Sequence, residues 1–530
     1  MELDLAPPTQ VRSALHSLNH PQTIENQVEL DTAQRFRQAG LASLGEHRRV
    51  TVLFADLSGY TELADHLDPD DLFEVVQDLI QGMVEIIYKY EGVVDKIMGD
   101  GIMAIFGAPV ALENHSERAV RAALEVQAQV ERISQARNDR LNAGLKLHIG
   151  INEGTVVVGA IGSDLRMDYT AIGETVNLAN RLQEAAQEGE ILVSDSIFRS
   201  TRALFNYAPA TRIQAKGYQQ PILAYRFLKE KPRPGSPRGI DGLGAPMVGR
   251  QRELALLVAS AKNLVEHKKS QFVLVTGEAG IGKSRLKTEL KQHLRNQPLL
   301  VIEGQSLTYR RSVPYWIFKD LLREFLKLPA NAPPILIKER LTSHAGTLLD
   351  KRSQESLPFL EHLLLQEQEG TAPTGQFAYL DPEQIRQNIF QSVRDLLLAE
   401  ARRQPLVLIL EDLHWADDTS LDLLAFLLEM LHQAPVMICA ISRPEHANQL
   451  VTGARLAEQR HGLSFGHVQL DNLSPLQSDQ LLKELLKIPE LPEYFRLLVL
   501  KRAEGIPFYL EEILRMLIDD GVIELVDGHW

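Results

Sequence analysis

The sequence contains a single cysteine, Cys439, among 530 residues. One thiol cannot form an intramolecular disulfide, and such sparse use of cysteine is typical of the reducing cytosol. Cys439 lies in the apolar run VMICAI, so we expect a small core residue rather than a reactive thiol. These features predict a cytoplasmic protein.

Long apolar runs and a basic excess are also missing. No stretch of about 18 apolar residues, the length that spans a bilayer, occurs in the sequence. The first residues, MELDLAPPTQ, lack the basic start and apolar centre of a signal peptide. The 56 basic and 70 acidic residues give a net charge of −14, which disfavours nucleic acid as a general partner. We therefore expect neither a membrane span nor a nucleic-acid partner.

Two aspartates are placed where strands are predicted to end. VTVLFA predicts a buried strand that ends at Asp56, and Ser58–Thr61 turn the chain toward a predicted helix. A carboxylate beside a helix N-terminus suits a metal–polyphosphate site, although many strands end in aspartate because of turn geometry alone. The stretch from Val93 to Gly107 predicts a β-hairpin with Asp100 at its tip. Two such carboxylates could hold two magnesium ions.

Four blocks of sequence resemble one enzyme family. They are FADLSGYT, DKIMGDGIMAIFGAP, HIGINEGTVVVGAIG and DYTAIGETVNLANRL, and they occur in the order found in class III nucleotidyl cyclases. The resemblance implies an α+β catalytic domain with a ferredoxin-like core over residues 48–228, preceded by an N-terminal extension over 1–47. The implied reaction joins the 3′-oxygen of a nucleoside triphosphate to its own α-phosphate and releases pyrophosphate.

The resemblance also assigns roles to residues of this chain. Asp56 and Asp100, with the Leu57 carbonyl, match the ligands of two Mg²⁺ ions. Asn177 and Arg181 lie four residues apart on one face of a predicted helix, a spacing that by itself favours a solvated polar face. The resemblance implies instead that Asn177 orients the ribose and that Arg181 stabilises the charged α-phosphate. Other matching positions would contact the triphosphate: Gly59, Tyr60, Thr61 and Lys216.

Lys96 and Thr170 match the pair that selects the base. A lysine can donate to adenine N1 and a hydroxyl can accept from the adenine amino group, so we expect ATP as substrate. Many adenylyl cyclases have aspartate where this chain has Thr170, and the threonine form resembles the soluble, bicarbonate-responsive subgroup. Lys96 and Asp100 lie only four residues apart across a tight turn and cannot readily reach one nucleotide. In this family, one protomer supplies the metal aspartates and the other supplies the base, ribose and phosphate contacts. The resemblance therefore implies a head-to-tail homodimer through the cyclase domain, with two equivalent sites.

A second domain follows a linker that is rich in proline and glycine, residues 229–246. Residues 247–444 predict an α/β P-loop ATPase, because QFVLVTGEAGIGKSRLKTEL gives a strand, a glycine-rich loop and a helix. The GxxxxGK[ST] pattern places phosphate-binding and magnesium-binding roles on Gly277, Gly282, Lys283 and Ser284. The strand PLVLIL then leads to Glu411, expected to hold one Mg²⁺ through water, and to Asp412, which could orient the attacking water. Arg443 resembles the sensor residue of related ATPases.

Residues 445–530 resemble the helical and winged-helix segment that follows such ATPases, with Gly505-Ile506-Pro507 near the adenine. The sequence stops at VDGHW, inside a predicted hairpin, so we expect a partial chain.

The sequence as a whole predicts a soluble adenylyl cyclase joined to a regulatory ATPase of the signal-transduction kind. One alternative is a guanylyl cyclase, which Lys96 disfavours. Another is an ATP-driven switch whose cyclase-like domain only dimerises, which the intact set Asp56, Asp100, Asn177 and Arg181 disfavours. The activating signal, the regulatory protein or small molecule, any role of bicarbonate, and whether ATP is hydrolysed or only bound stay open.

Overall fold

The structure is a computed structural model, and it divides at residues 238 and 239 into two compact units. It describes residues 46–59, 68–112, 114–136, 145–163, 166–214, 216–218, 220–231, 246–329, 332–348, 353–365, 377, 379–430, 432, 434–487, 492–519 and 521–524. Tyr60, Thr61, most of the N-terminal extension and linker, and the VDGHW hairpin lie outside these residues. Each unit is described by itself.

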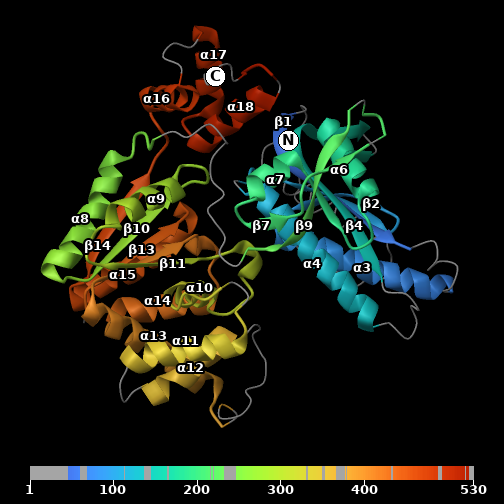
Figure 1. The fold of residues 1–530 in the computed structure, drawn as a ribbon. Helices are drawn as coiled ribbons and strands as arrows, with labels where there is room; N and C mark the ends of the chain where they lie inside the picture. The colour runs from blue at the N-terminus through green and yellow to red at the C-terminus, as the bar shows by residue number, and fades with distance from the viewer. Residues whose placement is uncertain are drawn as a thin grey trace, which may run out of the picture. The chain divides into compact units, whose positions relative to one another are not determined.

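The first unit is a mixed sheet covered by helices (Figure 1). The sheet runs in the order β2-β3-β1-β4-β6-β9-β7, with β5 paired to β4 and β8 paired to β9. The elements are β1 (Glu46–Ser58), α3 (Pro69–Lys89), β2 (Val93–Met98), β3 (Gly101–Phe106), α4 (His115–Ala136), β4 (Lys146–Ser163), β5 (Arg166–Ile172), α6 (Glu174–Ala185), β6 (Ile191–Ser194), α7 (Asp195–Thr201), β7 (Phe205–Tyr207), β8 (Thr211–Ile213) and β9 (Ile222–Glu230). This α+β architecture agrees with the predicted fold class.

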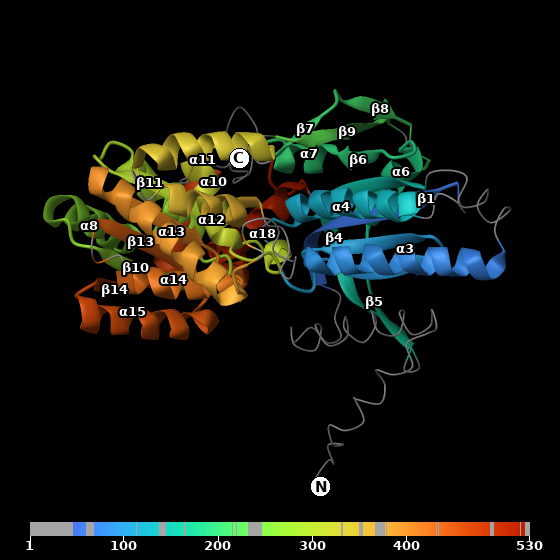
Figure 2. The same ribbon diagram turned by 90° about the horizontal axis from the view of Figure 1, so that it is seen from below.

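Strand β1 is buried on both faces, because successive side chains of a strand point to opposite sides. Val50, Val52 and Phe54 pack in one core cluster with Ala179 of α6. On the other face the Thr51 hydroxyl lies 2.7 Å from a ring nitrogen of His115 in α4. Helix α3 lies alongside α4 (Figure 2). Helices therefore cover both sides of β1 and hold it at a fixed depth.

Strand β4 packs against α6. It is one continuous strand of 18 residues, Lys146–Ser163. Its glycines make room for α6: a Cβ at Gly150 would lie 2.3 Å from the Ala179 carbonyl oxygen, and one at Gly154 would lie 2.6 Å from the Thr175 hydroxyl. The glycines thus permit close packing of a helix on the strand.

The second unit is built on the parallel sheet β11-β12-β13-β10-β14. Its central strands β10 (Gln271–Gly277), β12 (Leu406–Glu411) and β13 (Val436–Ser442) are buried at every position, as parallel strands covered on both faces usually are. Cys439 in β13 is fully buried, and burial raises the pKa of its thiol to about 12. The prediction of a core residue is confirmed.

Helices surround this sheet and continue past it. The remaining elements are α8 (Gln251–His267), α9 (Lys283–Leu294), β11 (Leu300–Gln305), η3 (Thr308–Arg310), α10 (Trp316–Phe325), α11 (Pro334–Leu348), α12 (Ser353–Leu365), α13 (Pro382–Arg403), η6 (Leu413–Trp415), α14 (Asp418–Met430), η8 (Pro444–His446), α15 (Ala447–His461), β14 (Ser464–Leu470), α16 (Pro475–Leu486), α17 (Glu493–Ala503) and α18 (Pro507–Asp519). The second unit is thus an α/β fold followed by helices, as predicted, but β14 joins its sheet beyond residue 444, where the ATPase domain was expected to end.

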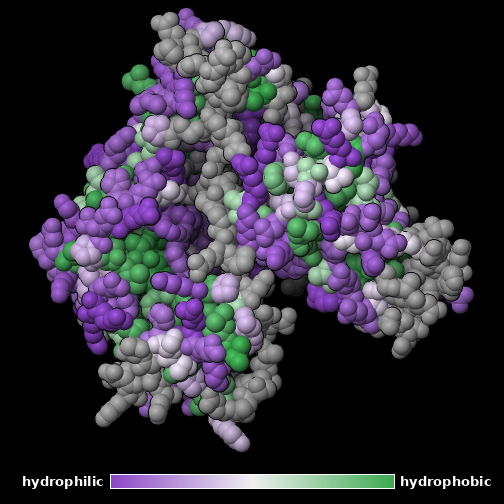
Figure 3. Space-filling view, in the orientation of Figure 1, coloured by the Kyte–Doolittle hydropathy of each residue, from purple (hydrophilic) through white to green (hydrophobic). Residues whose placement is uncertain are grey.

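The surface of the two units is mixed in character. Hydrophilic side chains dominate the face in view, with smaller hydrophobic patches between them (Figure 3). Among the residues that the structure describes, no helix combines the length and apolar character needed to cross a bilayer.

Candidate active sites

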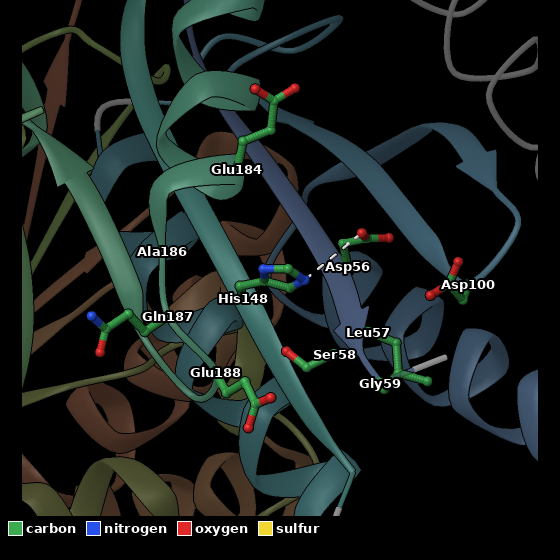
Figure 4. Close-up of a pocket in the computed structure, with 10 residues that line it drawn as sticks. All are labelled: Asp56, Leu57, Ser58, Gly59, Asp100, His148, Glu184, Ala186, Gln187 and Glu188. Atoms are coloured by element: carbon green, nitrogen blue, oxygen red, sulfur yellow. Dashed lines mark ion pairs between the residues drawn. The ribbon is translucent and has the colours of Figure 1, made fainter. Parts of the chain in front are cut away.

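The two predicted metal aspartates line one open pocket of the first unit (Figure 4). Asp56 comes from β1, and Asp100 comes from the two-residue turn between β2 and β3, where Met98 faces Gly101. The pocket has a volume of about 660 Å³ and its other lining residues are Leu57, Ser58, Gly59, His148, Glu184, Ala186, Gln187 and Glu188. Two carboxylates that lie far apart in the sequence are therefore neighbours in space.

The approach of the hairpin to β1 depends on a glycine. β1 pairs with β3 so that Ala55 faces Ile102, which places Gly101 against the following residue, Asp56. A Cβ at Gly101 would lie 2.5 Å from an Asp56 carboxylate oxygen and 2.8 Å from the Ala55 carbonyl oxygen. Only glycine allows the hairpin turn to lie this close to the Asp56 carboxylate.

The electrostatics of the pocket suit a cation. Burial raises the pKa of the Asp56 carboxyl, opposed by His148, whose Nε2 lies 3.8 Å from the carboxylate. Burial also raises the pKa of the Asp100 carboxyl, and the negative charge of Asp56 raises it further. Two carboxylates that disfavour each other's ionisation gain from a shared divalent cation.

The protein ligands at this pocket are few. Among the described residues, no group of three or more histidine, cysteine, aspartate or glutamate side chains is arranged to hold a metal ion. Mg²⁺ commonly binds through one or two carboxylates together with water and substrate phosphates. Asp56, Asp100 and the Leu57 carbonyl fit an ion of that kind, which depends on the substrate for part of its coordination.

The predicted base-selecting residues lie elsewhere in the unit. Lys96 is exposed on β2, whereas Thr170 on β5 has only 7% of its surface exposed. The Thr170 hydroxyl donates a hydrogen bond of 2.9 Å to Asp95, the residue before Lys96. This contact connects β5 to β2 at the position of the predicted pair.

The predicted catalytic residues are held by α6. Asn177 is exposed, and Arg181 lies one turn further along the same helix. The Arg181 guanidinium donates to the Glu184 carboxylate at 2.6 Å. Arg181 also lowers the pKa of the Tyr218 phenol, which burial and Glu174 raise, so the loop that carries Lys216 lies near Arg181.

The predicted residues therefore fall into separate groups within one chain. Gly59, one of the predicted triphosphate contacts, also lines the pocket of Asp56 and Asp100, whereas Lys96, Thr170, Asn177, Arg181 and Lys216 do not. The structure brings together the predicted metal ligands and Gly59, and it keeps Lys216 and the predicted base, ribose and α-phosphate contacts outside their pocket.

The second unit brings its predicted motifs into direct contact. Gly282 has a φ of 101°, in the left-handed region that favours glycine, and α9 begins at the next residue. The Lys283 ammonium donates to the carbonyl oxygens of Gly277 and Glu278, each at 2.7 Å. The Ser284 hydroxyl donates to the Glu411 carboxylate at 2.6 Å. The loop, the lysine and the strand-end carboxylate thus form one cluster.

A second lysine occupies the same cluster. Lys287 contacts the carboxylates of Glu411 and Glu303, and although burial alone would lower the pKa of Lys287, these two charges raise it. Asp412, with a φ of 58°, accepts a hydrogen bond of 3.2 Å from the Gln305 side chain. Glu411 thus has protein partners that a magnesium-bound water would have to displace.

The other predicted ATPase residues lie at the same edge of the sheet or against the loop. Arg443 follows β13 and its guanidinium carbon lies 5.4 Å from the centre of the Trp415 ring. The Phe508 backbone N–H donates to the Gly280 carbonyl at 3.1 Å, so the Gly505-Ile506-Pro507 segment reaches the glycine-rich loop.

Comparison with known protein families gives two matches that together cover most of the chain. Residues 43–229 match the adenylate and guanylate cyclase catalytic domain, and residues 246–439 match an AAA ATPase domain. The chain contains a cyclase catalytic domain followed by an AAA ATPase domain.

One relative matches most of this chain, and others match its cyclase domain alone. An uncharacterized protein of Rhizobium meliloti is 27% identical over 505 residues, which is 91% of this chain and 45% of that protein. An adenylate cyclase of Anabaena cylindrica is 32% identical over 186 residues, or 34% of each chain. The crystal structure of the adenylyl cyclase CyaB from P. aeruginosa is 31% identical, covering 37% of this chain and all of that one, with a TM-score of 0.35. The chain spans less than half the length of both curated relatives.

Sequence reasoning missed three residues of the cyclase domain. His148 faces Asp56 across β1 and β4, but only the strand register reveals that pairing. Glu184 lines the aspartate pocket from a helix whose orientation the sequence does not give. Asp95 could have been noticed, because it precedes Lys96 in the same block, yet its partner Thr170 is 75 residues away.

Proposed function

We propose that the chain is an adenylyl cyclase that converts ATP to 3′,5′-cyclic AMP and pyrophosphate, and that its ATPase domain regulates this activity. The observation that carries the proposal is the pairing of Asp56 and Asp100 in one pocket, where each carboxyl has a raised pKa. Such a pair is costly without a cation, and a cyclase uses cations to neutralise the triphosphate.

In the proposed reaction, the ATP 3′-hydroxyl gives its proton to water and its oxygen attacks the α-phosphorus. The bond from that phosphorus to the oxygen bridging the α- and β-phosphates breaks, and pyrophosphate leaves with that oxygen. Asp56, Asp100 and the Leu57 carbonyl would hold two Mg²⁺ ions, which supply charge neutralisation and lower the pKa of the 3′-hydroxyl. Asn177 would orient the ribose, and Arg181 would neutralise charge that develops on the α-phosphate. The triphosphate would contact Lys216 and the backbone from Gly59 to Thr61.

We further propose that each complete site needs two copies of the chain. The support is the separation seen within one chain, where Lys96, Thr170, Asn177 and Arg181 do not line the pocket of the aspartates. In a head-to-tail dimer, one copy would supply Asp56 and Asp100, and the other would supply Lys96, Thr170, Asn177 and Arg181.

The proposal is tested with the purified full chain, Mg²⁺ and either ATP or GTP. We expect cyclic AMP from ATP at a rate that exceeds cyclic GTP formation from GTP. Preference for GTP would favour a guanylyl cyclase. Absence of either product, with both nucleotides shown to bind, would favour a cyclase-like domain that only dimerises.

A further inference from the structure

Asp95 occupies an irregular position in the cyclase sheet. Val94 faces Ala104 and Lys96 faces Met103, so Asp95 is an extra residue at a shift in the β2–β3 register. A bulge of this kind turns a side chain away from the direction that regular alternation would give it. Asp95 is half-buried, and it directly precedes the exposed Lys96.

The partner of Asp95 is the candidate base-reading hydroxyl. Thr170 Oγ1 and Asp95 Oδ2 lie 2.9 Å apart, and only 7% of the Thr170 surface is exposed. A carboxylate can only accept hydrogen bonds, so the Thr170 hydroxyl must donate its single proton to Asp95. The Thr170 oxygen then has only lone pairs left for any further partner.

We propose that Asp95 is a positioning residue that sets purine specificity by fixing the direction of the Thr170 hydroxyl. The inference rests on the proposed cyclase function. With its proton committed to Asp95, Thr170 can accept a hydrogen bond from the 6-amino group of adenine but cannot donate one to the 6-oxo group of guanine. A site built for one hydrogen-bonding direction rejects the opposite one strongly, because a mismatched purine leaves desolvated polar atoms unpaired.

The same contact explains why threonine fits at position 170. An aspartate there would place a second carboxylate within hydrogen-bonding distance of Asp95. Two carboxylates so close repel each other, and one would have to take up a proton. The threonine oxygen can accept a hydrogen bond from the adenine amino group without adding a negative charge beside Asp95.

The test is Asp95→Asn in the full chain. The asparagine amide can donate to the Thr170 oxygen, which frees the hydroxyl proton for a 6-oxo purine. We expect the ratio of kcat/KM for ATP to that for GTP to fall by about tenfold or more. Asp70→Asn, an exposed position in the first turn of α3, is the matched control and should leave the ratio unchanged.

A structural role for Asp95 would lower both activities together and leave their ratio constant. A double variant separates these cases: in a Thr170→Val background, Asp95→Asn should produce no further change in the nucleotide ratio, because the hydroxyl is gone. An unchanged ratio in the Asp95→Asn single variant, or an equal change in the Thr170→Val background, overturns the inference.

Binding separates failure of this inference from failure of the proposed function. The 3′-deoxy forms of ATP and GTP lack the attacking hydroxyl, so their affinities report recognition without turnover. They are measured with Lys283→Ala present in every chain, so that the ATPase site contributes little. A preference for 3′-deoxy-ATP that Asp95→Asn weakens supports the inference even if no cyclic product forms. If the ratio of the two affinities is the same before and after the substitution, the inference is overturned.

Discussion

The two nucleotide sites of this chain are built in opposite ways. The predicted ATPase residues meet within one chain: the Ser284 hydroxyl donates to Glu411, and the Lys283 ammonium donates to a carbonyl of its own loop. The cyclase candidates are divided, because Asp56 and Asp100 share a pocket that the predicted base, ribose and α-phosphate contacts do not line. A site whose parts meet within one chain can work in a single copy, whereas a divided site links catalysis to association. The ATPase should therefore bind nucleotide as a monomer, and the cyclase should not turn over as one.

The largest expected effect is at the cyclase pocket. Asp56→Ala or Asp100→Ala should lower cyclic AMP formation at least about 100-fold, because each removes a charge that the proposed transition state requires. The rate is measured at saturating Mg²⁺, beside Asp70→Ala as a control and with melting curves for every variant. Wild-type turnover in either pocket variant, with a native melt, would refute the metal assignment.

Mixed dimers test the division of the cyclase site directly. Asp56→Ala and Arg181→Ala should each be inactive alone, since both sites of either homodimer carry one lesion. Random pairing of equal amounts should restore about a quarter of the wild-type rate, because half the dimers are mixed and each has one intact site. If mixed dimers form but no activity returns, the two residues belong to the same chain's site.

Lys283→Ala tests the single-chain character of the ATPase site. The variant should bind ATP at the ATPase domain at least about tenfold more weakly, because the ammonium is the charge nearest the loop carbonyls and the expected phosphates. Equilibrium binding at protein concentrations that favour monomers and dimers should give the same loss. A loss that appears only in dimers would mean that this site, too, is shared.

The smallest effect is on stability. Burial and the charge of Asp56 raise the pKa of Asp100 in the folded chain above its ordinary value of 3.8. In the pH window between these two pKa values, the folded chain holds a proton that the unfolded chain has lost. Stability therefore falls as the pH rises through the window, and the cost remains at neutral pH. Asp100→Asn should melt slightly above wild type at pH 7 in chelator, and the difference should shrink toward pH 4. A lower melting temperature for Asp100→Asn at pH 7 would contradict this reasoning.

The sequence predicted elements whose signals are local. The hairpin that carries Asp100 and the loop before Lys283 are each specified by glycines a few residues away. The sequence could not reveal features whose cause is a distant partner: Gly150 and Gly154 make room for residues of α6 that lie more than 20 positions later. The contacts of His148 and Asp95 were not predicted for the same reason, because strand register and a bulge decide which residues they face.

The close seat of α6 on β4 limits how the cyclase can be controlled. Backbone atoms of α6 lie where any side chain at Gly150 would stand, so the helix cannot slide or roll along the strand without a collision. Arg181 is therefore fixed with respect to the sheet that carries its own Asp56. If the site is shared, a signal can control the cyclase by changing the orientation of one cyclase domain relative to the other. The fold of each domain then stays unchanged.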